Sequence, residues 1–392
     1  MKLDTEYLNG TRFLLALWVF FGHFYQTIGG NKFIHMPFIS RILLSASCAV
    51  DGFMIITGFL MAYNYFQREE YEPFNDFSTA KHFWIKRFFR LYPVYIISIL
   101  VAFIFVVTIS SSRVDVFEFF IGTRQGSTWS IEHQSITGLI SHLFMVHGLI
   151  PQHITSILGP AWSLSLEAQF YALFPLIFVF IMNGKKVQQN RILIFALILP
   201  IVAIGCTKIL GIYSSHGILT TFNQPSFILF KGYLFLLGIV LAAVALNKIS
   251  NKYLMFTLLV TMPFINSITN LLIAFLVIFL LLDQLKSVIH PIFFSTLDAI
   301  RKILSCKVSK FGADTSYSLY LIHQIIIAPL LLLIITTFHL GKFPTILIGL
   351  IASLFMCIMV SYLLHITIEK PFINIGKNII KGSPQKYISK TA

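Results

Sequence analysis

The chain has 392 residues, of which 57% are hydrophobic and only 11% charged, and 40 of them are phenylalanine. A soluble domain carries about 25% charged residues, so this composition excludes an ordinary soluble protein and indicates a polytopic membrane protein. The formal net charge of +14 does not indicate a nucleic-acid partner, because the cations lie between apolar runs, where membrane topology accounts for them. The four cysteines are scattered, so we expect neither a disulfide framework nor a zinc site.

In chain order, about ten apolar runs are long enough to be candidate membrane helices. They lie near 8–28, 41–65, 92–110, 161–182, 192–210, 226–246, 253–265, 267–283, 315–338 and 344–368. We therefore predict an all-α fold, a polytopic transmembrane bundle of about ten spanning helices. The runs near 253–283 are short and are joined by a very tight turn.

The distribution of cations predicts the orientation of this bundle. If the N-terminus is cytoplasmic, about 21 lysines and arginines lie in cytoplasmic segments and about six outside, which predicts that both termini are inside. The apolar stretch 136–150 is too short to cross, so we expect a re-entrant or interfacial helix there. We divide the chain into a transmembrane domain, residues 1–371, and a short basic cytoplasmic tail, residues 372–392.

The first apolar run contains two ionisable residues, Arg12 and His23. Eleven residues make just over three helical turns, so both side chains lie on one face with a rise of roughly 16 Å between them. Ionisable groups in an apolar helix usually face a bundle interior or a wet cavity and mark a functional site. The alternative is an Arg12 that extends to the membrane surface and a His23 that is bonded to a neighbouring helix.

Two carboxylates are predicted at a depth similar to that of His23. Asp51 lies in the second run and Glu167 in the fourth, both toward the extracytoplasmic side. We interpret His23, Asp51 and Glu167 as candidate catalytic residues, since one imidazole with two carboxylates suits proton transfer. A structural cluster of hydrogen bonds is the alternative.

A second cluster is predicted on the cytoplasmic side. Arg87 and Arg90 are three residues apart and share a helix face, in a segment that we expect to open the third helix. Two arginines beside free backbone N–H groups make an anion site, although the positive-inside rule also explains such a pair. Glu369, expected at the end of the last helix, could hold one of these arginines in place.

Other polar residues are expected to contact the substrate or support the site. Ser316, Tyr320 and His323 form a single stripe along one helix, and Lys231 lies well inside an apolar run. Polar bonds between helices are the alternative for the stripe. The full set of substrate-contacting or supporting candidates is Trp162, Ser163, Tyr171, Lys231, Ser316, Tyr320, His323 and Glu369.

Taken together, these motifs resemble the acyltransferase-3 family of bacterial inner-membrane acyltransferases, and the resemblance runs through nearly the whole chain. The matching segments are Arg12 to His23, Arg87 to Arg90, Trp162 to Glu167 (Trp-Ser-Leu-Ser-x-Glu), Ser316 to His323 (Ser-Tyr-x-Leu-Tyr-x-x-His) and Glu369 to Pro371. Two positions depart from the family pattern. Ala168 stands where a second glutamate is common, and Met54 to Thr57 replaces a usual Phe-Phe-x-x-Ser run.

The resemblance implies a multi-pass enzyme of the bacterial cytoplasmic (inner) membrane that O-acylates a cell-surface glycan or a lipid-linked sugar. It implies acyl-CoA, usually acetyl-CoA, as the cytoplasmic donor, and neither a metal nor a nucleic acid. Some members carry a fused extracytoplasmic hydrolase-like domain after the last helix. This chain shows none, so a separate glycan-handling partner is expected.

The residue chemistry agrees with that expectation. Arg87 and Arg90 suit the phosphates of CoA, and Arg12 suits the donor or its pantetheine arm. His23 suits a general base near neutral pH, with Asp51 or Glu167 fixing its tautomer. A glycan exporter or proton-coupled transporter is the rival interpretation, because intramembrane His, Asp and Glu also suit proton relays. We detect no inverted repeat that would favour the rival.

Overall fold

The computed structural model describes residues 5–124, 135–183, 186–209, 226–262 and 265–381, and within them nearly all regular structure is helical. The helices are α1 Tyr7–Thr27, α2 Pro37–Leu44, α3 Ser47–Arg68, α4 Phe77–Ile104, α5 Val106–Ile121, α6 Ile136–Leu143, α7 Trp162–Ile181, α8 Gln189–Ile209, α9 Ile228–Ala245, α10 Asn251–Thr261, α11 Ser267–Leu280, α12 Leu282–Leu285, α13 Pro291–Leu304, α14 Lys307–Phe338, α15 Lys342–Leu364 and α16 Lys370–Lys381. Strands β1 Met182–Asn183 and β2 Lys186–Val187 form a small antiparallel hairpin.

In the part of the chain that the structure describes, six helical segments are long and apolar enough to cross a membrane. They are Ser47–Arg68, Phe77–Ile104, Gly159–Ile181, Ile228–Ala245, Lys307–Phe338 and Lys342–Lys381. Gln189–Ala203 and Ser267–Leu280 are apolar but shorter. The predicted all-α membrane bundle is thus confirmed as a class, while the number of about ten crossings and the orientation stay predictions.

The segment 136–150 contains the eight-residue helix α6 and a 3₁₀ turn at His147–Leu149. Eight residues rise only about 12 Å, far short of an apolar layer of about 30 Å. This geometry agrees with the prediction that 136–150 does not cross. The apolar run predicted at 41–65 is divided, since α2 ends at Leu44 and α3 begins at Ser47.

Helix α4 begins earlier than the sequence suggested. It starts at Phe77, where the Asp76 carboxylate caps it by accepting a bond of 2.9 Å from the Ser78 amide, and it runs through Pro93. The expectation that Arg87 and Arg90 open a helix is therefore wrong. Because Arg87 lies ten residues into α4 (from 77 to 87), its surroundings offer no free N-terminal amides.

The last helix continues beyond the point where we expected it to end. A π-helical turn, His365–Glu369, joins α15 to α16, and the helix runs through Pro371 to Lys381. The wider turn gives the proline ring, which has no N–H to donate, room beside the preceding carbonyls. Gly376 packs closely on Phe89 of α4. The boundary expected at 371 is thus not a boundary in the structure, because α16 is packed against the bundle up to Lys381.

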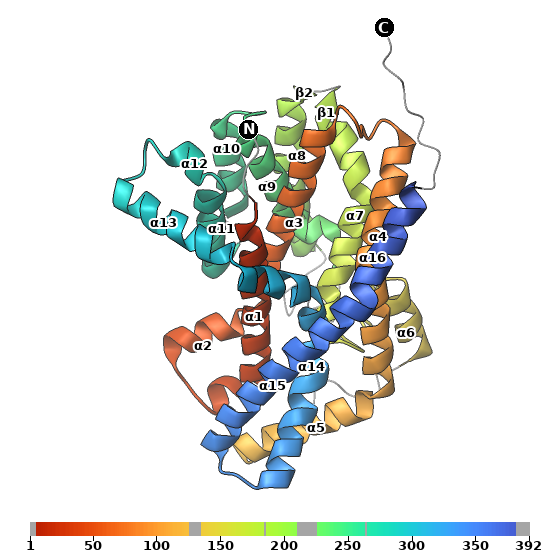
Figure 1. The fold of residues 1–392 in the computed structure, drawn as a ribbon, viewed down its shortest axis with the longest axis vertical. Coiled ribbons are helices and arrows are strands. Elements are labelled where there is room, and N and C mark those ends of the chain that lie inside the picture. The colour runs from red at the N-terminus through yellow and green to blue at the C-terminus, as the bar shows by residue number, and fades with distance from the viewer. Residues whose placement is uncertain (1–4, 125–134, 184–185, 210–225, 263–264, 382–392) are drawn as a thin grey trace.

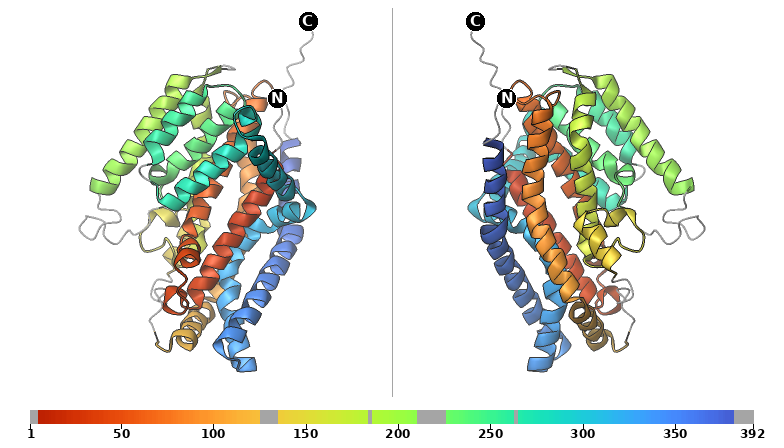
Figure 2. Two further views of the ribbon diagram at one scale, coloured as in Figure 1. Left: turned by 90° about the vertical axis from the view of Figure 1, so that its left-hand side faces the viewer. Right: turned by 90° about the vertical axis from the view of Figure 1, so that its right-hand side faces the viewer.

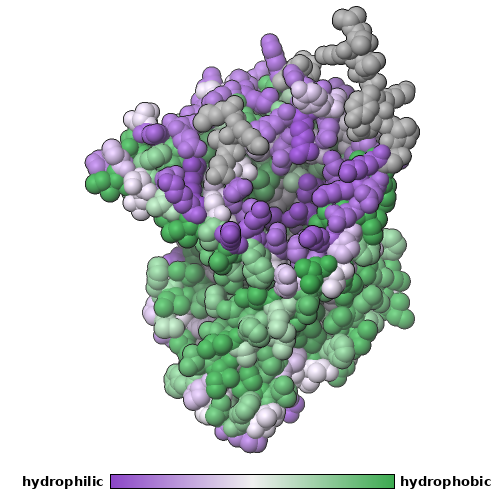
Figure 3. All heavy atoms as spheres, in the orientation of Figure 1, coloured by the Kyte–Doolittle hydropathy of each residue, from purple (hydrophilic) through white to green (hydrophobic). Residues whose placement is uncertain are grey.

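Several connections that carry charged residues of either sign lie at one end of the molecule (Figures 1 and 2). The α3–α4 connection, the β1–β2 hairpin and the end of α16 lie at the upper end, while α5 and the α14–α15 connection lie at the lower end. Hydrophilic residues cover the upper part of the face in Figure 3, and hydrophobic residues cover the lower half. The two ends of the bundle thus differ in polarity, and the orientation stays a prediction.

Close helix contacts hold the centre of the bundle together. Helices α3 and α9 approach so closely that a Cβ on Gly58 would meet the Phe235 carbonyl, and one on Gly238 would meet the Ile55 carbonyl. Small residues commonly permit such approach inside membrane bundles, where packing replaces the hydrophobic effect as the force between helices. Helix α1 packs along α14, and this pair carries Arg12, His23, Ser316, Tyr320 and His323.

Candidate functional site

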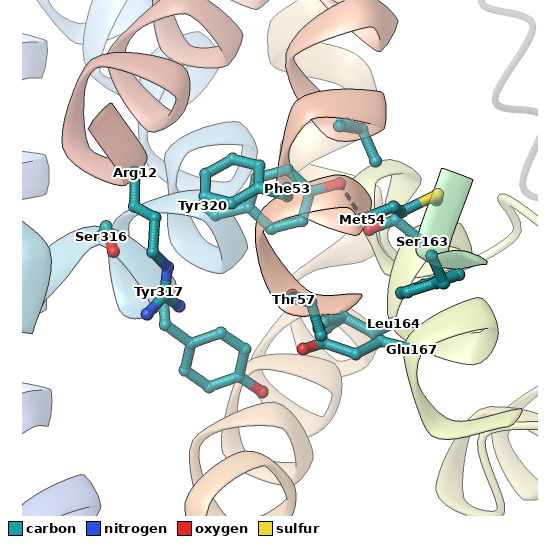
Figure 4. A pocket seen from close by; sticks show the side chains of 12 residues that line it. Arg12, Phe53, Met54, Thr57, Ser163, Leu164, Glu167, Ser316, Tyr317 and Tyr320 are labelled. Carbon is teal, nitrogen blue, oxygen red and sulfur yellow. Dashed lines mark hydrogen bonds between the residues drawn. The ribbon is translucent and has the colours of Figure 1, made fainter. Parts of the chain in front are cut away.

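A pocket lies in the middle of the bundle, between α1, α3, α7, α9 and α14. Five residues that the sequence singled out line it. The complete lining is Arg12, Val50, Phe53, Met54, Thr57, Ser163, Leu164, Glu167, Phe235, Ser316, Tyr317 and Tyr320. Figure 4 shows Arg12, Ser316 and Tyr317 on one side of the pocket, and Thr57, Ser163 and Glu167 on the other. Side chains from distant parts of the chain therefore meet in one place.

Arg12 extends toward Tyr317 in this pocket (Figure 4). Its charged electrostatic neighbours include Arg90, Glu167 and Glu369. Within the part of the chain that the structure describes, no carboxylate lies within ion-pair distance of the Arg12 guanidinium. The Arg12 end of the pocket is thus a cationic position that remains open to an anion.

Glu167 also belongs to this end of the pocket. Its Oε1 accepts a hydrogen bond of 2.5 Å from the Tyr171 hydroxyl, and the Trp84 indole donates to the Tyr171 carbonyl oxygen at 3.0 Å. Glu167 makes no bond to His23 in the structure. Similar predicted depth therefore did not make the two residues partners, because position along a helix says nothing about the side of the helix on which a residue lies.

Ser163 and Tyr320 join α7 to α14 across the pocket. Their hydroxyl oxygens are 2.7 Å apart, and the Pro160 carbonyl oxygen accepts from Ser163 at 3.1 Å and from Tyr320 at 3.0 Å. The Ser316 hydroxyl donates to the Ala313 carbonyl of its own helix at 2.8 Å. The predicted stripe on α14 therefore places Ser316 and Tyr320 at the pocket and continues to His323, whose ring centroid lies 6.2 Å from that of Tyr320.

His23 meets a second imidazole. Its Nδ1 lies 2.7 Å from Nε2 of His323, and the two rings stack with centroids 4.8 Å apart. His323 is completely buried, whereas His23 is partly exposed. The expectation that Asp51 or Glu167 holds His23 is thus replaced by a contact between α1 and α14.

Asp51 has a different partner in the structure. Its Oδ1 lies 2.5 Å from Nζ of Lys231, and its Oδ2 accepts a bond of 3.1 Å from the Thr269 hydroxyl. The Lys231 ammonium also lies 5.7 Å from the centroid of the Trp162 ring. The two unusual charges that the sequence showed in apolar runs therefore neutralise each other, which explains why both are tolerated there.

Arg87 faces a second cavity, between α4 and α7. Its guanidinium lies 5.5 Å from the centroid of the Tyr171 ring, and its Nε is buried without a hydrogen-bond partner. Arg90 is an electrostatic neighbour of both Arg12 and Tyr171. Arg87 and Arg90 are thus both neighbours of Tyr171, and Arg90 is also a neighbour of Arg12.

Glu369 does not hold either of these arginines. Its Oε2 lies 3.1 Å from Nδ1 of His365, one turn earlier on the same helix. Among the ion pairs of the described segments, none involves Arg87 or Arg90. The expected clamp between Glu369 and an arginine is therefore absent from that part of the chain.

Two groups escaped the sequence analysis. Tyr317 lines the pocket and donates from its hydroxyl to the Leu91 carbonyl at 2.7 Å, although its place beside Ser316 was a usable signal. His142 and His147 are both completely buried and stack with ring centroids 3.9 Å apart. Burial lowers the pKa of His142 to about 4 and the pKa of His147 well below its ordinary value. Two histidines in one short apolar stretch could have indicated this pair.

No group of three or more His, Cys, Asp or Glu side chains could hold a metal ion among the residues that the structure describes. The side chains of the central pocket offer their own chemistry. It consists of a guanidinium, a carboxylate and several hydroxyls, with an imidazole pair beyond Tyr320.

Comparisons with known proteins give a family and partial relatives. Residues 5–366 match a family model described as an acyltransferase domain, Acyl_transf_3. The chain is 28% identical over 176 residues to Acyltransferase MdmB of Streptomyces mycarofaciens, covering 43% of this chain and 38% of that protein. It is 29% identical over 203 residues to Nose resistant to fluoxetine protein 6 of Caenorhabditis elegans, covering 46% of this chain and 23% of that protein. The chain thus spans less than half of either curated relative, and no solved structure matches it.

Proposed function

Because the chain belongs to the acyltransferase-3 family, whose acyltransferase domain its residues 5–366 match, we propose that it is a membrane O-acyltransferase. In this proposal it moves an acyl group, in the simplest case acetyl, from cytoplasmic acyl-CoA to a hydroxyl group on the opposite side of the membrane. The acceptor is a cell-surface glycan or a lipid-linked sugar. The protein lies in a bacterial cytoplasmic membrane, requires no metal, and works with a separate glycan-handling partner.

The observation that carries this proposal is the cationic end of the central pocket. Arg12, Arg87 and Arg90 surround the Glu167–Tyr171 pair, and none of the three has a carboxylate within ion-pair distance in the described segments. Guanidinium groups bind phosphate through two parallel hydrogen bonds, and cations in apolar surroundings need a compensating anion. A donor with several phosphates on a long thin arm, such as acyl-CoA, would supply that anion.

The proposed chemistry proceeds along α1 from Arg12 toward His23. With the phosphates held near Arg12, Arg87 and Arg90, the thioester reaches further along the helix. Neutral His23 takes the proton of the acceptor hydroxyl while the hydroxyl oxygen forms a bond to the thioester carbonyl carbon. The C–S bond then breaks, and the departing CoA sulfur takes the proton from His23. The free thiol and the acylated acceptor are the products.

The carboxylates have separate parts in this proposal. Glu167 lines the pocket together with Arg12, so it is placed to contact the bound substrates. Asp51 is engaged by Lys231, so it supports the pocket wall and does not exchange protons with substrate. In this proposal Asp51 is therefore a supporting residue, in place of the catalytic role that the sequence suggested.

The test is acyl transfer by purified protein in detergent or liposomes, with His23→Ala as the main variant. Loss of a general base typically costs 10²- to 10⁴-fold in rate, so transfer should fall to or below about a hundredth of the wild-type rate while the protein still accumulates. His35→Ala is a matched control, since His35 is exposed in the α1–α2 connection. If His23→Ala keeps more than about a tenth of the wild-type rate, His23 is not the base.

An exporter or proton-coupled transporter of the same glycan is the competing function. The intramembrane pair of Asp51 and Lys231 favours it, because proton relays also use such residues. The same assay separates the two functions. A carrier would leave acyl-CoA intact, whereas the proposed enzyme releases free CoA in proportion to the acylated acceptor.

A further inference from the structure

Two imidazole rings meet where α1 and α14 pack together. Nδ1 of His23 and Nε2 of His323 are 2.7 Å apart, and the rings are stacked at an interplanar angle of 24°. On the far side of His323, Nδ1 lies 3.2 Å from the Leu319 carbonyl oxygen, one turn back along α14. Three groups thus form a chain that runs from His23 through His323 to the backbone.

The direction of the hydrogen bonds in this chain follows from the carbonyl. A carbonyl oxygen only accepts, so Nδ1 of His323 must carry the proton that it donates to Leu319. In a neutral imidazole the other nitrogen is then an acceptor, so Nε2 of His323 accepts from Nδ1–H of His23. His23 therefore carries its proton on Nδ1, and its lone pair is on Nε2.

We propose that His323 is a positioning residue, which fixes the tautomer and the ring orientation of His23 so that Nε2 is the nitrogen that receives the acceptor proton. This inference rests on the proposed function, in which His23 is the general base. It assigns to an imidazole the role that carboxylates or backbone carbonyls commonly have beside functional histidines.

The two carboxylates that the sequence suggested as partners of His23 are bonded to other residues. Asp51 is bonded to Lys231 and Thr269, and Glu167 is bonded to Tyr171. Each carboxylate therefore accepts its hydrogen bonds elsewhere in the bundle. His323, by contrast, is completely buried and has bonds only to His23 and to its own helix among the described contacts.

A neutral His323 suits the proposed role of His23 as the general base. When the acceptor hydroxyl gives its proton to Nε2 of His23, the ring becomes an imidazolium whose Nδ1–H still points at His323. A hydrogen bond from a charged donor is stronger than one from a neutral donor, so the contact with His323 strengthens as the proton is transferred. His323 itself keeps its proton on Nδ1 throughout, and the proton on His23 Nε2 leaves with the CoA sulfur.

The competing interpretation is that His323 only joins two helices. It predicts that any substitution at 323 acts through folding. Acceptor variants separate the two interpretations, because the oxygen of a glutamine at 323 reaches approximately the place of the imidazole Nε2, whereas a leucine fills the space without accepting a bond. Ser318→Ala is the structural control, since Ser318 is equally buried on α14 and its hydroxyl has no partner.

The experiment measures kcat and KM for acyl transfer by purified, folded His323→Leu, His323→Gln and Ser318→Ala. We expect His323→Leu to lower kcat by roughly 10- to 100-fold with KM for acyl-CoA unchanged, the range typical for partners of functional histidines. His323→Gln should recover most of that loss, and Ser318→Ala should match the wild type. The double variant His23→Ala/His323→Leu should be no slower than His23→Ala alone, because both residues act in one unit.

The outcomes separate this inference from the proposed function. If His23→Ala is inactive while His323→Leu keeps the wild-type kcat, the inference is overturned and the proposed function stands. If His323→Gln loses as much kcat as His323→Leu, hydrogen-bond acceptance is not what the position supplies, and the inference is again overturned. An active His23→Ala variant would remove the proposed base itself, whatever the variants at 323 do.

Discussion

The ion pair between Lys231 and Asp51 allows a quantitative test of the bundle. The two charged atoms lie 2.5 Å apart, and the side chains are 21% and 7% exposed respectively. Removing one partner of a buried pair leaves an uncompensated charge and typically costs about 3–5 kcal/mol. We expect Lys231→Met to cost about 3 kcal/mol in the free energy of unfolding, because it leaves the nearly buried Asp51 carboxylate without its cation.

The two single variants should differ in a direction that their burial determines. Asp51→Asn should cost less than Lys231→Met, because the more exposed ammonium can reach solvent and also lies 5.7 Å from the Trp162 ring centroid. The double variant Asp51→Asn/Lys231→Met should be more stable than the sum of the single costs predicts, by about 2 kcal/mol or more. Denaturant unfolding of purified protein in one detergent would measure all three variants.

An exposed ion pair on α13 serves as the matched control. Lys302 and Asp298 are 2.8 Å apart, but the lysine is 79% exposed. Because solvent already compensates these charges, Lys302→Met should cost less than about 1 kcal/mol. Equal costs for Lys302→Met and Lys231→Met, or strictly additive costs at Lys231 and Asp51, would refute the reasoning from burial. If the neutral double variant is folded but inactive in acyl transfer, Asp51 returns as a catalytic candidate.

Two further predictions concern binding and pH. Arg87→Ala and Arg90→Ala should each weaken acetyl-CoA binding, measured by titration, by roughly 10- to 100-fold. Lysine at either position should recover only part of the lost affinity, because an ammonium lacks the guanidinium fork. The control Arg68→Lys, at a half-exposed surface position, should bind acetyl-CoA like the wild type. Equal affinities for the wild type, Arg87→Lys and Arg90→Lys would refute the assignment of these arginines to the phosphates. The buried His142–His147 pair should make the segment around it less stable in acid. Since the pKa of His142 is lowered from 6.5 to about 4, its neutral form contributes stability that is complete above pH 6.5 and is lost as the pH falls toward 4, at a cost of up to about 3 kcal/mol. Hydrogen-exchange protection of residues 136–150, corrected for the intrinsic exchange rate at each pH, should fall over that range in the wild type and much less in His142→Phe/His147→Phe, and the same fall in both would contradict the assignment.

Much of the architecture followed from the sequence, because a membrane constrains a chain so strongly. Apolar runs of spanning length specify helices, since every backbone polar group must be satisfied within the bilayer. The shortness of 136–150 likewise limited it to a non-crossing segment, and the structure has the eight-residue α6 and a 3₁₀ turn there. The family motifs were also readable, because the family matched at residues 5–366 is the one that they resemble.

Helix ends were harder to predict from the same information. The start of α4 at Phe77 depends on the Asp76 cap, in a polar region that an apolar pattern does not report. The continuation of the last helix through Pro371 depends on a π turn and on the packing of Gly376 against Phe89. The start of α4 is thus set by local capping, whereas at Pro371 local propensity disfavours a helix and tertiary contacts override it.

The sequence by itself determined which residues are chemically unusual, whereas only the tertiary structure decided which of them are partners. Arg12, His23, Asp51, Glu167 and His323 all stand out as polar groups in apolar runs. Counting along a helix estimates the depth of a residue, but it does not say which side of the helix faces a neighbour. The partner of a polar residue also lies far away in the sequence. Packing of α1 on α14 joins His23 to His323 across 300 positions, while packing of α3 on α9 joins Asp51 to Lys231 across 180. Side-chain pairing is set by which helix faces meet, and that is a property of the folded bundle alone.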